Sequence, residues 1–341
     1  MAVVLVSLKL RFSTMESFAA LGVEADRVGL HGVWLSEPWG FDATVLLGWL
    51  AARTERVLIG THVLSVFSRT PAAFAGLAGS LQRASSGRFR LGLGASGPQV
   101  VEGWHGVPFA APVARTRDVI AVVRTALGGD TVAIDGTSVS LPLPGGVGKA
   151  LRFAQLGEPM TVPIYVAAMG DRNLEMAGAV ADGWIPFPWA PRGAAAYEEH
   201  LAVGRAGRSA ALGPLALAPS VSVGFGDVTH LRRMERSSIA FSLGAMGPPG
   251  QNFYVDAVGR LGFGDVARMV QRRWLDGDRD AARDGVSDDL VDAVSILGDA
   301  ELAERRLAEY RAAGVDELVV ELRHRDLPSQ LADVRTLAEL L

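Results

Sequence analysis

The chain contains no cysteine among its 341 residues, which excludes disulfide bonds, thiolate nucleophiles and most zinc or iron–sulfur sites. Its six histidines show no paired ligand spacing, so we expect no metal site. The 33 lysines and arginines are outnumbered by 37 aspartates and glutamates, and they form no dense runs. Nucleic acid is therefore not an expected partner.

The sequence also lacks a stretch of about twenty uninterrupted apolar residues, the length that a membrane-spanning helix needs. Its first ten residues, MAVVLVSLKL, have no basic segment before the apolar run and no small-residue cleavage site after a long one. We interpret them as a strand rather than a signal peptide. A cytoplasmic protein with no membrane partner is expected.

What the sequence does contain is a repeated alternation of strand-like and helical patterns. The β-prone runs cover residues 3–8, 32–36, 57–64, 89–93, 164–167, 183–187, 215–224 and 318–322. Apolar residues spaced for one helical face occupy 15–28, 44–52, 71–84, 114–127, 174–180, 194–203 and 327–340. This alternation predicts an α/β fold, a (β/α)8 TIM barrel whose active site lies where the strands end.

Two segments interrupt the repeat. Residues 131–155 contain a good hairpin turn at 134–137 and a Pro/Gly-rich crossing, so we expect an insertion before the fifth strand. Residues 226–316 are mostly helical in pattern and separate the seventh strand from the eighth. We expect extra helices there that cover the barrel mouth, within a single domain over 1–341.

A glycine-rich motif follows the fourth predicted strand. Gly92, Gly94 and Gly97 satisfy the GxGxxG pattern of dinucleotide-binding domains. That fingerprint belongs to a first strand, opens a helix at once and expects an acidic residue about twenty positions later at the end of the next strand. Here Pro98 follows, and the region around Asp118 has a helical pattern. We therefore prefer a barrel strand that ends on small residues, against which a flat ring can lie. A tight turn that needs no ligand is the alternative.

A second strand ends in a turn suited to phosphate. The run 164–168 is followed by Met169, Gly170 and Asp171 and then by a helical pattern. Free amides and the helix dipole make such a helix start a good anion site. The alternative is a plain strand-to-helix turn, in which Asp171 caps the helix.

These segments, with WLSEPWGFDA at 34–43, MGPPGQNFY at 246–254 and AGVDELVVEL at 313–322, closely resemble the luciferase-like family of flavin and deazaflavin oxidoreductases. The resemblance is strongest to the branch that uses coenzyme F-420. It implies an F-420-dependent oxidoreductase that moves a hydride between the deazaflavin and a small organic substrate, as a homodimer. Two alternatives stay open: an FMN-dependent monooxygenase of the same fold, and a non-catalytic barrel that binds a ligand.

The resemblance also implies particular site residues. A bulge in strand three would carry a non-proline cis peptide between His62 and Val63, behind the cofactor ring. His62 would contact the cofactor or else be a hydrogen-bonded histidine near the barrel mouth. Glu37 would be the general acid or base, with a loop glutamate paired to an arginine as the alternative. The implied cofactor-binding residues are Ser36, His62, Val63, Leu64, Gly94, Ala95, Ser96, Gly97, Ala168, Met169 and Gly170.

The substrate pocket would be formed by the loops 37–42, 104–110 and 244–255. Trp39, Trp104 and His105 are its candidate lining residues, although aromatic side chains there would equally serve to close the core.

Overall fold

The computed structural model describes residues 4–247, 249–250 and 252–341. Val3, the first residue of the expected opening strand, and two residues of MGPPGQNFY lie outside this range. The strands of the barrel sheet are β1 Leu5–Leu10, β2 Gly32–Leu35, β3 Leu58–Thr61, β4 Leu64–Ser65, β5 Phe89–Gly94, β8 Ile164–Ala167, β9 Gly183–Trp184, β10 Ala216–Leu217, β11 Ser220–Phe225, β12 Ser295–Gly298 and β13 Glu317–Leu322.

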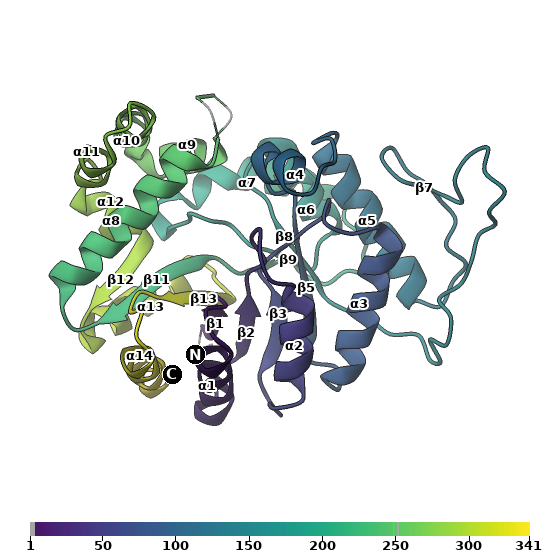
Figure 1. The fold of residues 1–341 in the computed structure, drawn as a ribbon, viewed down its shortest axis with the longest axis horizontal. Helices are drawn as coiled ribbons and strands as arrows, with labels where there is room; N and C mark the ends of the chain where they lie inside the picture. The colour runs from purple at the N-terminus through teal and green to yellow at the C-terminus, as the bar shows by residue number, and fades with distance from the viewer. Residues whose placement is uncertain (1–3, 248, 251) are drawn as a thin grey trace.

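Within the described residues these strands form one curled parallel sheet (Figure 1). Its order is β10, β9, β8, β5, β3, β2, β1, β13, β11 and β12, and β4 pairs with β5. The stretch 216–225 joins the two sides of the sheet, because β10 pairs with β9 while β11 pairs with β13. The predicted TIM-barrel-like fold is thereby confirmed.

Helices surround the sheet. Their bounds are α1 Met15–Val28, α2 Ala43–Ala51, α3 Pro71–Ala84, α4 Pro98–Gly103, α5 Pro112–Leu127, α6 Asp171–Val180, α7 Ala195–Ala206, α8 Val228–Ala245, α9 Phe253–Val258, α10 Gly264–Leu275, α11 Arg279–Asp284, α12 Asp288–Val294, α13 Ala300–Ala312 and α14 Leu327–Glu339. A 3-10 turn covers Pro191–Gly193 and a π turn covers Gly259–Phe263.

Helix α4 corrects one step of the sequence argument. A helix does open directly after Gly97, with Pro98 as its first residue, where proline is favoured because its missing N–H has no partner to lose. The dinucleotide-binding interpretation is still excluded, since β5 lies in the middle of the sheet and Asp118 lies within α5.

The segment 131–155 contains the antiparallel hairpin of β6 Ile134–Asp135 and β7 Ser140–Leu141, which extends away from the barrel at the right of Figure 1. Asp118 ties the hairpin to α5, because its carboxylate accepts hydrogen bonds from the amides of Ser138 and Val139 at 2.6 and 2.9 Å. This contact explains why the tip of the hairpin has a glycine: a Cβ on Gly136 would lie 2.5 Å from the Asp118 carboxyl.

The segment 226–316 holds helices α8 to α12, which pack around an apolar core of their own beside β11 and β12 (Figure 1). Strand β12 was not predicted. Its four residues pair with the free edge of β11, and so short an apolar run cannot be distinguished from a helical segment by periodicity.

Inside the barrel, successive residues of each strand point alternately outward and inward. On β1, Val6, Leu8 and Leu10 belong to the outer core under the helices. The intervening Ser7 and Lys9 therefore point into the barrel. We call the closed lower end, around Glu317, the barrel floor, and the upper end, where the strands end, the barrel mouth.

Candidate active site

A backbone bulge marks the third barrel strand. The peptide bond between His62 and Val63 is cis, as expected, and it lies between β3 and β4. Strand β3 pairs with the first half of β5 and β4 with its end. The bulge therefore interrupts the strand while both parts stay in the sheet.

The glycines of β5 make room for this bulge. A Cβ on Gly92 would lie 1.8 Å from the Thr61 carbonyl oxygen, and one on Gly94 would lie 2.7 Å from Val63 Cγ2. The Thr61 hydroxyl also donates to the Gly92 carbonyl and accepts from its amide, both at 2.8 Å. Gly92 and Gly94 are therefore explained by close packing of two strands, independently of any bound ring, whereas a Cβ on Gly97 would meet only the Gln99 side chain.

His62 lies at the barrel mouth as a hydrogen-bonded histidine. Its Nε2 is 2.8 Å from the Ser220 hydroxyl of β11, and its ring meets Trp34 edge-on at 6.2 Å between centroids. Burial lowers the pKa of His62 to about 3, and the positive charge of Lys9 acts in the same direction. The imidazole is therefore uncharged at neutral pH.

A buried set of charges surrounds the mouth, and we call it the mouth network: Lys9, Glu235, Glu321 and Arg323. Lys9 Nζ lies 2.8 Å from Glu321 Oε2, and Arg323 Nη1 lies 3.1 Å from Glu321 Oε1. Arg323 also pairs with Glu235 of α8 and donates to Ser222 of β11. The network thus connects β1, β11 and β13 to the helical segment.

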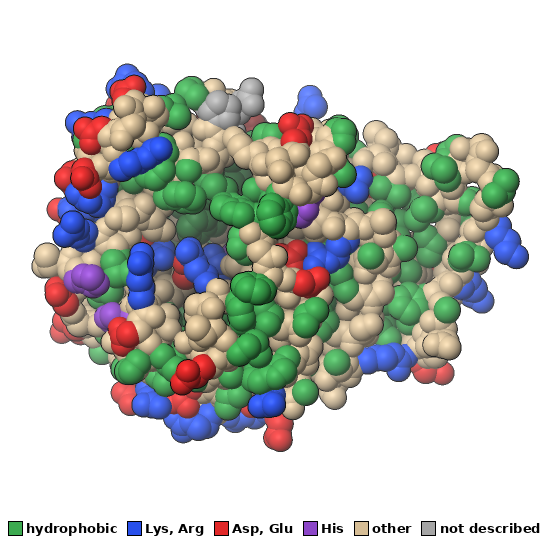
Figure 2. All heavy atoms as spheres, viewed as in Figure 1, with side chains coloured by type: hydrophobic (Ala, Val, Ile, Leu, Met, Phe, Trp, Pro, Cys, Tyr) green, Lys and Arg blue, Asp and Glu red, His purple; other side chains and the backbone are tan. Residues whose placement is uncertain are grey.

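The cations of this network keep Glu321 ionised. Burial by itself would raise the pKa of this carboxyl, but the charges of Lys9, Arg323 and Arg11 hold it below its ordinary value. Figure 2 shows a hollow near the centre of the drawn face, with basic and acidic side chains beneath hydrophobic ones. The sequence argument missed Lys9, Glu321 and Ser220. Their signal is a polar side chain at alternate positions of otherwise apolar strands.

Glu37 occupies the loop after β2 as the partner of an arginine. Arg69 donates to both carboxylate oxygens, at 2.6 and 2.8 Å, and the Ala43 amide at the start of α2 donates to one of them at 2.9 Å. Arg69 also pairs with Asp42 at 3.0 Å. These contacts match the alternative in which Glu37 braces its loop.

The turn after β8 is open. Gly170, not Asp171, is the N-cap of α6, and a Cβ on Gly170 would meet no atom within 4 Å. Among the described residues the amides of Gly170, Asp171 and Arg172 have no hydrogen-bond acceptor. Arg260 donates to the Met169 carbonyl and to Asp171, both at 2.6 Å, and so places a cation beside the turn. The free amides, the open approach and the arginine fit a phosphate.

The remaining predicted residues are less clearly connected. Trp39 is 48% and Trp104 63% exposed, so neither closes the core. In the described part of the chain no hydrogen bond or ion pair joins them, or His105, to His62 or the mouth network. Ala95, Ser96 and Gly97 connect β5 to α4, and Ser96 has a φ of 62°.

Comparisons with known proteins agree with this architecture. The sequence model of the luciferase-like monooxygenase family matches residues 8–317. A Mycobacterium tuberculosis protein, Rv3520c, named provisionally as a coenzyme F-420-dependent oxidoreductase, is 36% identical over 316 residues, covering 89% of this chain and 90% of that protein. The chain belongs to the luciferase-like monooxygenase family, and it is an enzyme of the oxidoreductase class.

Solved structures show the same fold. The coenzyme F-420-dependent tetrahydromethanopterin reductase of Methanopyrus kandleri superposes with a TM-score of 0.80 at 21% identity, covering 100% of this chain and 99% of that one. An F-420-dependent secondary alcohol dehydrogenase, solved with an F-420–acetone adduct, gives a TM-score of 0.73 at 18% identity, with 100% and 98% covered. No helix among the described residues is both long and apolar enough to cross a membrane.

Proposed function

We propose that the protein transfers a hydride between coenzyme F-420 and a small organic substrate. Support comes from the names of its relatives, among them methylenetetrahydromethanopterin reductases and F-420-dependent glucose-6-phosphate dehydrogenases. The observation that carries the proposal is the open turn at Gly170, at the same end of the barrel as the His62–Val63 bulge. A long cofactor with a phosphate at one side and a flat ring at the other suits this pair of features.

The binding residues follow from this placement. The amides around Met169 and Gly170 would hold the phosphate, and Ala168 begins that turn. The bulge formed by His62, Val63 and Leu64 would lie behind the ring. Ser36 and the segment 94–97 would border it, as the family resemblance implies. When bound, the cofactor supplies the hydride donor or acceptor.

The chain's own polar groups would position the substrate. His62 is uncharged, so it offers a polar wall and no acidic proton at neutral pH. Glu37 has both oxygens occupied by Arg69, so its proposed part is to fix the loop beside the mouth rather than to transfer a proton.

Cofactor titration tests the proposal. F-420 fluorescence should be quenched on addition of the protein, whereas FMN at the same concentrations should bind more weakly. Tighter binding of FMN would favour the monooxygenase alternative, and binding of neither would favour a non-catalytic barrel. Sedimentation of the same samples checks the homodimer, which is a further part of the proposal.

The variant Gly170→Leu locates the phosphate. A Cβ added at Gly170 would meet no protein atom within 4 Å. The leucine side chain should therefore block the phosphate and weaken whole F-420 strongly, while leaving a truncated deazaflavin without the phosphate nearly unaffected. Asp171→Asn is the matched control, because removing a negative charge next to the turn should leave affinity level or raise it. Equal losses for whole and truncated cofactor in Gly170→Leu would place the phosphate elsewhere.

A further inference from the structure

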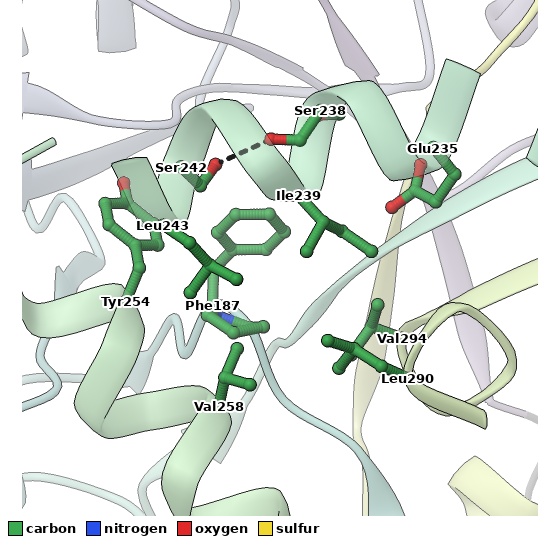
Figure 3. Close-up of a pocket in the computed structure, with 11 residues that line it drawn as sticks. Phe187, Glu235, Ser238, Ile239, Ser242, Leu243, Tyr254, Val258, Leu290 and Val294 are labelled. Atoms are coloured by element: carbon green, nitrogen blue, oxygen red, sulfur yellow. Dashed lines mark hydrogen bonds between the residues drawn. The ribbon is translucent and has the colours of Figure 1, made fainter. Parts of the chain in front are cut away.

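The pocket shown in Figure 3, between α8, α9, α12 and the loop after β9, is too small for an organic ligand. Its volume is about 20 Å³, enough for about one water molecule. A larger space lies on the outer face of the barrel, where α5, α6 and α7 lie side by side (Figure 1). This space is a groove with a volume of about 360 Å³ that is open to solvent along one side. We call it the outer groove.

The outer groove follows the solvent-facing side of α6. Arg172, Met176 and Ala179 line it, and their spacing of four and three residues places them on one face of that helix. Toward the end of α6, the α7 wall contains Gly204 and Gly207, which have no side chain to fill the space. Ala179 follows Arg172 by seven residues, or about 10 Å along a helix axis, so the groove can hold an extended chain of about eight carbon atoms.

Apolar side chains form the body of the groove. Met176 is buried at its floor, and Val113 and Val203 lie on the α5 and α7 walls. Val203 is 58% exposed, so covering its side chain with a ligand would remove apolar surface from water. Glu175, an acidic residue on the wall, is already engaged, because its Oε1 lies 3.1 Å from His200 Nδ1. The body of the groove therefore suits an aliphatic chain.

Two arginines give the other end of the groove a positive charge. Arg117 and Arg172 both line it, both are exposed, and both lie in the first two turns of their helices. Within the described residues neither of them makes an ion pair. By contrast, Arg124, also on α5, and Arg260 are each paired with an aspartate. A carboxylate bound at Arg117 and Arg172 would gain charge-assisted contacts without breaking an existing ion pair.

We propose that the outer groove binds a free aliphatic carboxylate of about eight to ten carbon atoms. Its carboxylate contacts Arg117 and Arg172. Its chain lies along Met176 and Ala179 toward Gly207. Charge complementarity selects the acid over a neutral or cationic molecule of the same length, and the apolar body selects a long chain over a short one. The site lies outside the barrel, and it does not depend on the hydride transfer proposed at the mouth.

Four probes test this chemistry on the unaltered protein: octanoate, butanoate, octanamide and octylammonium. Ligand-observed NMR gives their dissociation constants. A half-buried methylene strengthens binding about twofold, so octanoate should bind about 15-fold more tightly than butanoate. The exposed arginines should give octanoate about a fivefold advantage over octanamide, and octylammonium should bind more weakly than octanamide. Equal binding of octanoate and octanamide, or of octanoate and butanoate, would overturn the proposal.

Matched variants locate the binding. Ala179→Trp fills the groove, whereas Ala202→Trp makes the same change on α7 at a residue outside the lining. Arg117→Gln and Arg172→Gln each remove one charge, and Arg152→Gln removes an exposed arginine of the hairpin segment. We expect at least a tenfold loss of octanoate affinity in Ala179→Trp only. The advantage over octanamide should fall in Arg117→Gln and in Arg172→Gln but not in Arg152→Gln. Equal effects of the test and control variants would contradict this placement.

Two further measurements distinguish other occupants of the groove. F-420 should bind the octanoate-loaded protein within about twofold of its affinity for the free protein, because the groove lies outside the mouth. Mutual displacement would place octanoate at the phosphate turn and overturn the proposal. Sedimentation should be the same for the wild type and Ala179→Trp, and a dimer that dissociates only in this variant would make the groove an interface between copies of the chain, which also overturns it. Failure of F-420 to bind would refute the proposed function and leave the outer groove in place.

Discussion

The charge state of His62 gives the sharpest test of the site's electrostatics. Its pKa falls from an ordinary 6.5 to about 3, first because of burial and then because of Lys9. At 1.36 kcal/mol per pKa unit, placing a proton on His62 in the folded protein costs about 5 kcal/mol more than in the unfolded chain. The imidazole should thus stay neutral down to mildly acidic pH.

The consequence for stability has a definite sign. Between about pH 3 and 6.5 the unfolded chain holds a proton on His62 that the folded chain does not, so the free energy of unfolding falls as the pH falls. Going from pH 7 to pH 5, this one group should remove about 2 kcal/mol. Other titrating groups contribute as well, but they are shared by the wild type and a His62 variant and cancel in the difference.

His62→Gln removes the titration and keeps an amide nitrogen near the position of Nε2, within reach of Ser220. Urea unfolding followed by tryptophan fluorescence at pH 7 and pH 5 should show the wild type losing about 2 kcal/mol more than the variant. His230→Gln, at an exposed residue of α8, controls for the loss of a histidine. Parallel pH curves for wild type and His62→Gln would show that His62 is not desolvated, and would refute the account of the mouth given above.

Three further predictions concern packing and pairing. Glu317→Gln should lower the free energy of unfolding by about 3–5 kcal/mol, measured by urea unfolding against the exposed Glu301→Gln. Gly94→Val should lower the thermal unfolding midpoint of the cofactor-free protein, because its Cβ would lie 2.7 Å from Val63 Cγ2. An unchanged midpoint would show that the backbone of the bulge moves aside to make room for the valine side chain. Glu37→Gln should lower the free energy of unfolding by roughly 1–3 kcal/mol and leave turnover within about twofold. A hundredfold loss of turnover at unchanged stability would instead show that Glu37 acts as a general acid.

Much of the fold could be predicted because the alternation of patterns is local and repeated. The predicted helices 15–28 and 71–84 coincide with α1 and α3. The short elements were harder. Helix α4 begins at Pro98, because proline is favoured at the first position of a helix, so Pro98 does not argue against a helix there. Strand β12 acquires its character only by pairing with β11, a tertiary contact that no local pattern contains.

The candidate site likewise has parts that the sequence could predict and a part that it could not. The bulge at His62–Val63 and the turn at Gly170 are encoded in short segments, so motif and resemblance could find them. The mouth network is encoded in strand register. Lys9 and Glu321 lie near opposite ends of the chain and meet because β1 and β13 pair with these two residues side by side. A single sequence gives no direct sign of that register.

The two ends of the barrel differ in the partners of their buried carboxylates. Strand β13 places Glu317 and Glu321 on the inner face, with Val319 in an apolar layer between them. At the floor, Ser7 and Trp34 donate to one oxygen of Glu317 at 2.5 and 2.7 Å, and Arg90 donates to the other at 2.5 Å.

All of these donors are fixed by the barrel itself, so the floor carboxylate is fully coordinated by protein groups. At the mouth, Glu321 is shared among Lys9, Arg11 and Arg323, and Arg323 also pairs with Glu235 of the helical segment. A buried carboxylate whose partners all belong to the barrel stabilises that end, whereas a carboxylate shared among cations of several elements links the barrel to the helical segment. The two buried carboxylates of β13 therefore have different partners: Glu317 is held by donors of the barrel floor, whereas Glu321 belongs to the mouth network, at the end where the active sites of barrel enzymes lie.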